Sequence, residues 1–165
     1  MILLATDLDR TLLPNGSEPD SGQLSLLFKS LKNKKIKLAY VSGRNLPLLK
    51  EALKEYSLIL PDIFIGAVGT EIYKKENKDL KPDPLWPKYV LDNSAHWNDV
   101  WIRQNIKEPE IELQEPEVQN QFKVSFYCSA TKNPETLLTT IKEKLQAKKI
   151  SAKVVYSFDP LKKTG

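Results

Sequence analysis

The sequence is poor in cysteine, arginine and long apolar runs, and each shortage narrows the class of protein. Its 165 residues include one cysteine, Cys128, so no internal disulfide can form, and we expect a reducing compartment, the cytoplasm. The three arginines (Arg10, Arg44 and Arg103) and a net charge of +4 do not indicate nucleic-acid binding, although a positive field would suit a small anionic substrate. No apolar run approaches the roughly 18–20 residues of a membrane span, and the first residues do not resemble a signal peptide, so we expect no membrane partner.

What the sequence does contain is an α/β pattern in its first half. A continuous apolar run predicts a buried strand at residues 2–6, and mainly apolar segments predict a second strand at 36–41 and a third, buried strand at 63–68. Helical spacing of leucines predicts helices from Leu24 and from Leu46, the second capped by Asn45 with Pro47 in its first turn. Strand, helix and strand in this order predict right-handed βαβ units and a parallel, Rossmann-like sheet.

The second half has a different composition. Residues 74–87 carry four lysines and three prolines, which indicates a boundary loop, although Ile72 could begin a short hairpin. Beyond it we expect a small α+β unit, with a helix near Trp97, a Pro- and Glu-rich loop at 108–117, a half-exposed strand at 122–128, a helix from 134 and a strand at 151–156.

Polar groups follow three consecutive predicted strands: Asp7, Asp9 and Thr11, then residues 42–44, then residues 69–71. The carboxyl ends of parallel strands lie along one edge of a sheet, where α/β folds build their sites. Two neighbouring carboxylates suit Mg²⁺. Asp7 could act as a nucleophile towards phosphorus and Asp9 as an acid and base, while Ser42 could bind a phosphate oxygen at a helix N-terminus.

Simpler interpretations stay open for each motif taken alone. An acid pair after a first strand can be a turn and a helix cap, and Ser-Gly-Arg can be an ordinary loop. The single histidine, His96, fits surface or local packing. The positions of the polar groups on consecutive strand ends favour a shared site over these alternatives.

These residues carry a resemblance to a known family. Asp7-Leu-Asp9-Arg-Thr11 resembles the first motif, DxDxT, of the haloacid dehalogenase-like (HAD-like) phosphatases, and Ser42 resembles their second motif. The segments VSGRN and VGTEIY are similar to the Cof-type branch with a C2 cap, and within it to the sucrose-phosphate phosphatase group. Residues 119–127 resemble the cap strand of that group. The resemblance implies the N-terminal half of a HAD-like core at 1–79, an α+β cap at 80–156 and a return towards the core at 157–165.

The resemblance also implies an activity. The expected enzyme is a phosphoric monoester hydrolase that cleaves a sugar phosphate, with sucrose 6-phosphate as the best guess, through an aspartyl-phosphate on Asp7. Asp9 would be the acid/base, and the Asp7 carboxylate with the Asp9 carbonyl would bind Mg²⁺. A mannosyl-phosphoglycerate or another hexose phosphate is an alternative substrate.

Further residues gain expected roles from the same resemblance. Thr11 would steady the loop, and Ser42 would bind the transferring phosphoryl group. An alternative interpretation of Lys123 is a solvent-exposed lysine on a strand face with no role in binding. The residues expected near the substrate are Gly43, Arg44 and Asn45 in the core, and Asn120 and Lys123 at the sugar hydroxyls.

Two motifs of the family do not occur in the 165 residues: a lysine that holds the phosphoryl group and an acidic GDxxND motif. We therefore expect a truncated chain, a fragment or one part of a split protein, in which residues 2–6 form an edge strand open to association with another chain. The alternative function is a catalytically incomplete module that binds a sugar phosphate or a partner enzyme such as a sucrose-phosphate synthase.

Overall fold

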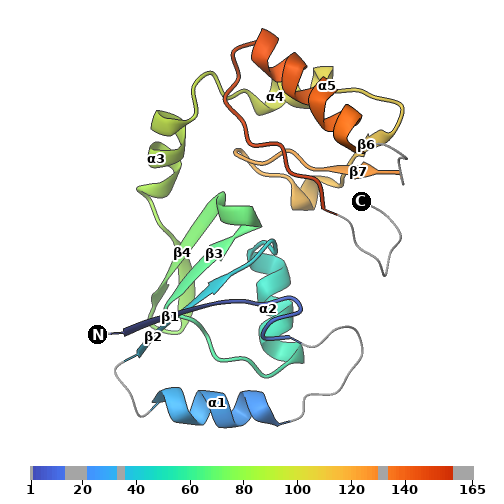
Figure 1. Cartoon of the computed structure of the whole chain (residues 1–165). Helices are drawn as coiled ribbons and strands as arrows, with labels where there is room; N and C mark the ends of the chain where they lie inside the picture. The colour runs from blue at the N-terminus through green and yellow to red at the C-terminus, as the bar shows by residue number, and fades with distance from the viewer. Residues whose placement is uncertain (1, 14–21, 33–35, 130–133, 158–165) are drawn as a thin grey trace. The chain divides into compact units, whose positions relative to one another are not determined.

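A computed structural model describes residues 2–13, 22–32, 36–129 and 134–157. The chain divides into two compact units, Met1–Pro87 (unit 1) and Lys88–Gly165 (unit 2), and each is considered by itself (Figure 1). None of the helices within the described ranges is long and apolar enough to cross a membrane.

Unit 1 is built on a five-stranded sheet with the order β1-β2-β3-β4-β5 (Figure 1). The first three strands are parallel and are joined by α1 and α2, while β4 and β5 add an antiparallel hairpin. The predicted α/β class with a parallel, Rossmann-like sheet is therefore confirmed. The elements are β1 (Ile2–Asp7), α1 (Gln23–Lys32), β2 (Ile36–Val41), α2 (Leu46–Glu55), β3 (Ile63–Gly66), the 3₁₀-helix η1 (Ala67–Gly69), β4 (Glu71–Glu76) and β5 (Asp79–Pro82).

One hydrophobic cluster joins both helices of unit 1 to the sheet. Phe28 of α1 and Leu49 of α2 belong to the same buried cluster as Tyr40 of β2 and Phe64 of β3. A fully buried side chain of this size contributes about 1.5–3 kcal/mol. As predicted, Asn45 caps α2, and its side chain accepts a hydrogen bond from the Leu48 N–H at 3.1 Å.

β1 lies at the edge of this sheet. Among the described strands its single neighbour is β2. Its apolar residues Ile2 and Leu3 are 65% and 56% exposed, although strands of parallel sheets are normally covered on both faces. The edge position predicted from the sequence is confirmed.

Unit 2 is an α+β arrangement with a two-stranded antiparallel sheet, β6-β7. Its core is formed by Ile102, Ile106, Leu145 and Ile150, so α4 and α5 pack together against the partly buried sheet residues Ile111 and Phe126. The remaining elements are α3 (Trp86–Asn93), which straddles the unit boundary, α4 (Asp99–Asn105), β6 (Ile111–Leu113), η2 (Pro116–Val118), β7 (Phe126–Cys128) and α5 (Pro134–Ala147).

Several predicted elements differ from those observed. The two compact units divide after Pro87, at the end of the boundary loop expected at 74–87, whereas the family resemblance implied a division between 79 and 80; β5 pairs with β4 and remains in unit 1. The expected loop at 108–117 contains β6, and the expected strand at 122–128 is reduced to β7. The strand predicted at 151–156 is wrong, because those residues join no ladder; the Ser151 N–H bonds to the Ala95 carbonyl instead. Of the predicted return at 157–165, residues 158–165 lie outside the described residues.

Candidate active site

The first part of the site is a tight turn that follows β1. Leu8 is fully buried, and its carbonyl accepts hydrogen bonds from the N–H groups of Leu12 at 3.0 Å and Leu13 at 2.8 Å. This turn brings Thr11 back to the end of the strand, where its hydroxyl donates to Asp7 Oδ2 at 3.0 Å. Thr11 thus steadies the carboxylate that the sequence singled out.

Asp9 is held by Arg44, which follows β2. The guanidinium forms a fork: Nη2 lies 2.7 Å from Asp9 Oδ1, and Nε lies 3.1 Å from both carboxylate oxygens. The hydrogen bond with Asp9 raises the pKa of Arg44, against the opposing effect of partial burial. This pair joins the two strand ends, as the parallel register of β1 and β2 allows.

Ser42 lies between these groups and is almost fully buried. Its hydroxyl donates to Asp9 Oδ2 at 3.4 Å and accepts the Arg44 N–H at 3.1 Å. Gly43 and Asn45 flank Arg44 in the same loop, where Asn45 begins α2. The structure therefore brings the predicted core residues Asp7, Asp9, Thr11, Ser42, Gly43, Arg44 and Asn45 to neighbouring strand ends.

A turn after β3 supports this loop, and the sequence analysis did not predict it. Ala67, Val68 and Gly69 have φ values of 49°, 59° and 87°, which are left-handed. The Ala67 N–H donates to the Arg44 carbonyl at 2.8 Å, and the Val68 N–H donates to the Ser42 carbonyl at 3.3 Å. A β-branched residue rarely adopts such a conformation, and strain of this kind is often found at functional sites. The only signal in the sequence is the pair of glycines, Gly66 and Gly69.

The two candidate sugar-binding residues lie in unit 2. Asn120 and Lys123 face each other as an isolated antiparallel bridge in the loop between β6 and β7. Lys123 is half-buried, and its ammonium donates to the Val118 carbonyl at 3.3 Å, so it is not a solvated lysine on a strand face.

Comparisons with known proteins place the chain in a class. A HAD-like hydrolase of Nitrosococcus oceani is 39% identical over 166 residues, which cover 99% of this chain and 45% of that protein. Sucrose-phosphatase 1 of Nicotiana tabacum is 31% identical over 166 residues, which cover 94% of this chain and 36% of that protein. The structure of the sucrose-phosphatase from Synechocystis sp. in complex with sucrose and phosphate matches 87% of this chain and 56% of that chain, with a TM-score of 0.68 and 29% identity. The fold is that of the HAD-like hydrolases.

The family within this class is also defined. The sequence model of the sucrose-6F-phosphate phosphohydrolase family matches residues 1–161, and the chain belongs to that family. The chain spans less than half the length of the two curated relatives, 45% and 36%.

Proposed function

We propose that this chain carries the reacting carboxylates and the sugar-contacting loop of a phosphatase acting on a sugar phosphate, with sucrose 6-phosphate as the substrate. The observation that carries the proposal is the grouping of Asp7, Asp9 and Ser42 at two neighbouring strand ends of a chain in this family. The sucrose and phosphate named for the Synechocystis structure support a ligand of this chemical class.

In the proposed reaction an oxygen of the Asp7 carboxylate attacks phosphorus, and the bond between phosphorus and the sugar oxygen breaks. Asp9 gives a proton to the leaving oxygen, which releases the sugar. A water molecule then returns a proton to Asp9, attacks the aspartyl-phosphate and releases phosphate. Both carboxylate oxygens of Asp9 are engaged by Arg44, so this exchange requires the guanidinium to turn towards the substrate phosphate.

The donor set fits Mg²⁺, a hard cation that is commonly held by one or two carboxylates together with substrate phosphate oxygens. The Asp7 carboxylate and the Asp9 backbone carbonyl would hold it. Within the described ranges no group of three or more histidine, cysteine, aspartate or glutamate side chains is placed to hold a metal ion, so these two groups are the ligands proposed from this chain. When bound, the ion supplies positive charge that offsets the repulsion between a carboxylate nucleophile and the phosphate.

Asn120 and Lys123 would contact the sugar hydroxyls, and Ser42, Gly43, Arg44 and Asn45 would bind the phosphate end of the substrate. We propose no nucleic-acid or membrane partner. The single cysteine, which excludes an internal disulfide, supports a cytoplasmic location.

A second candidate function is a sugar-phosphate-binding module that is catalytically incomplete, or one that binds a partner such as a sucrose-phosphate synthase. It is tested beside the phosphatase because the family's phosphate-binding lysine and GDxxND motif do not occur in the 165 residues. A binding module has no need of two adjacent carboxylates, which favours the phosphatase.

One assay separates the two functions. The purified chain is incubated with sucrose 6-phosphate and MgCl₂, and phosphate release is compared with that of Asp7→Asn. A phosphatase should lose about 10³-fold or more of its rate in Asp7→Asn, and chelation of the metal should stop release until Mg²⁺ is restored. Sugar-phosphate binding without release would identify the module, and the absence of both would contradict both functions.

We also propose that the open edge of β1 allows association with another chain. The edge position of β1 among the described strands and the exposed side chains of Ile2 and Leu3 support this. Light scattering across a range of concentrations should show association that Leu3→Lys reduces. A chain that stays monomeric at high concentration would contradict the proposal.

A further inference from the structure

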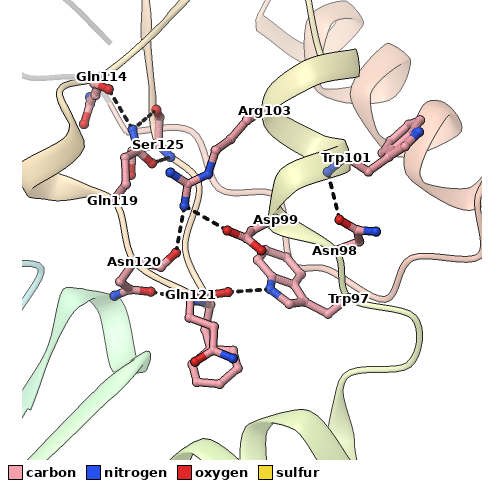
Figure 2. Close-up of polar contacts among 11 residues, drawn as sticks. Trp97, Asn98, Asp99, Trp101, Arg103, Gln114, Gln119, Asn120, Gln121 and Ser125 are labelled. Atoms are coloured by element: carbon pink, nitrogen blue, oxygen red, sulfur yellow. Dashed lines mark hydrogen bonds and ion pairs between the residues drawn. The ribbon is translucent and has the colours of Figure 1, made fainter.

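The loop between β6 and β7, residues 114–125, is held in place largely by polar side chains. The four buried core residues of unit 2 (Ile102, Ile106, Leu145 and Ile150) lie outside it, although its partly buried Val124 packs against that core. Polar contacts instead connect it to itself and to the region of α4 (Figure 2). Fixing a surface loop costs conformational entropy, and these polar contacts offset part of that cost.

Gln119 closes the neck of the loop. Its Oε1 accepts the Ser125 N–H at 2.8 Å, while its Nε2 donates to the carbonyls of Ser125 and Gln114, both at 2.9 Å (Figure 2). The Gln114 N–H also donates to the Ser125 carbonyl at 3.0 Å. The carboxamide of Gln119 therefore bonds to the backbone on both sides of the neck, where the β6-β7 ladder ends.

The tip of the loop is held from the α4 side. Arg103 Nη2 donates to the Asn120 carbonyl at 3.2 Å and to Asp99 Oδ2 at 3.0 Å, and Trp97 Nε1 donates to the Gln121 carbonyl at 2.7 Å (Figure 2). Arg103 makes these hydrogen bonds through Nη2. Its Nε is buried and has no hydrogen-bond partner in the described part of the chain. These contacts from the α4 side bind backbone carbonyl groups, while the Asn120 side chain takes part in the turn itself, its Oδ1 accepting the Phe122 N–H at 2.8 Å.

Between neck and tip, Asn120 and Lys123 are directly opposite each other, with their N–H groups donating to each other's carbonyls at 3.2 and 3.3 Å. Residues opposed in this way carry their side chains on one side of the strand pair. We propose that Gln119 is a positioning residue: by closing the neck it holds Asn120 and Lys123 on one side of the loop, ready to contact a sugar. This inference rests on the proposed sugar-phosphate ligand.

The experiment measures the binding of two probes, sucrose 6-phosphate and inorganic phosphate, to the full chain. In Gln119→Leu we expect about tenfold weaker binding of sucrose 6-phosphate, because two side chains must then be ordered on binding, and unchanged binding of inorganic phosphate. Gln119→Glu keeps the acceptor for the Ser125 N–H but loses both donated hydrogen bonds, so it should also weaken the binding of sucrose 6-phosphate alone. It replaces Gln119→Leu in the experiment if that variant does not fold. Gln146→Leu, on the exposed side of α5, makes the same chemical change away from the loop and should bind as the unaltered chain does.

Two further outcomes separate the positioning role from the proposed function. If Asn120→Ala weakens sucrose 6-phosphate binding while both Gln119 variants bind normally, the positioning role is wrong and the proposed ligand stands. If the unaltered chain binds sucrose 6-phosphate no better than phosphate, the proposed ligand and the positioning role both fail. Equal losses for both probes in the Gln119 variants would show a general structural effect and would also refute the inference.

Discussion

Replacing Gly66 with alanine tests how closely the sheet controls the candidate active site. Gly66 has φ of −109°, which any residue can adopt, so its backbone conformation does not require glycine. The space around position 66 does require glycine, because an added Cβ would lie 2.6 Å from Phe64 Cε1 and 2.9 Å from the Arg44 carbonyl oxygen. Phe64 is fully buried and stacks on Tyr73, so its ring has little room to withdraw.

The expected cost follows from two opposing terms. Overpacking a core costs about 1–3 kcal/mol, while a glycine-to-alanine change stabilises by about 0.4–1 kcal/mol through the unfolded state. Gly66→Ala should therefore lower the free energy of unfolding of unit 1 by about 1–2 kcal/mol. The same shift would disturb the Arg44 carbonyl, and with it the hydrogen bond from the Ala67 N–H.

Gly43→Ala is the matched control, because a Cβ at position 43 would meet no atom within 4 Å. It should be neutral or stabilising by up to about 1 kcal/mol. Amide hydrogen exchange in β2 and β3 reports unit 1 alone, with α5 as an internal reference for unit 2. Phe64→Leu should relieve part of the loss in Gly66→Ala, giving a coupling of about 0.5 kcal/mol or more. Equal stability of the two alanine variants would refute the steric argument.

Three further predictions concern the same unit. Arg44→Met should lower the free energy of unfolding by less than about 1 kcal/mol, because the Asp9 side chain is 49% exposed and solvent screens such ion pairs. Urea unfolding measures this free energy, and a larger loss would show that the ion pair stabilises the fold. Val68→Gly should stabilise by about 1 kcal/mol, since relief of left-handed strain outweighs the entropy cost of glycine, and a lower thermal midpoint would contradict it. Burial opposes ionisation of Asp62, yet a hydrogen bond from the Leu38 N–H and a nearby lysine lower its pKa. This stabilisation is present above the unfolded pKa of about 3.9 and lost as pH falls through the lower folded pKa, so Asp62→Asn should flatten the loss of stability on acidification, as measured by unfolding at a series of pH values.

The parallel strands could be predicted because each is mainly apolar, although the burial expected for β1 was wrong, since Ile2 and Leu3 are exposed. A short hairpin from Ile72 was among the expectations and is observed as β4 and β5, but the lysines of these strands indicated a loop, since exposed strands form through backbone pairing that composition does not reveal. The strand expected at 151–156 failed for the converse reason. Val154 packs against the core of unit 2, but among the described residues no neighbouring strand is available to complete a ladder.

The site was predictable to the extent that it lies in local motifs. Asp7, Asp9 and Ser42 could be recognised from their spacing and from the strands before them. That Arg44 forks onto Asp9 could not, because the contact spans 35 positions and depends on the register of β1 and β2. The left-handed turn at residues 67–69 was missed because valine disfavours that conformation, so the surrounding structure, and not local preference, determines it.

The two candidate sites differ in what holds them. The Asp9–Arg44 contact depends on long-range strand pairing, whereas Gln119 and Ser125 are only six positions apart. A change in the sheet such as Gly66→Ala should therefore weaken phosphate binding while hydrogen exchange in the 114–125 loop stays unchanged. Gln119→Leu should have the opposite effect, with faster exchange in the loop and unchanged exchange in β2 and β3. If either variant altered both regions, the two sites would be energetically coupled, and neither would be held by its own contacts alone.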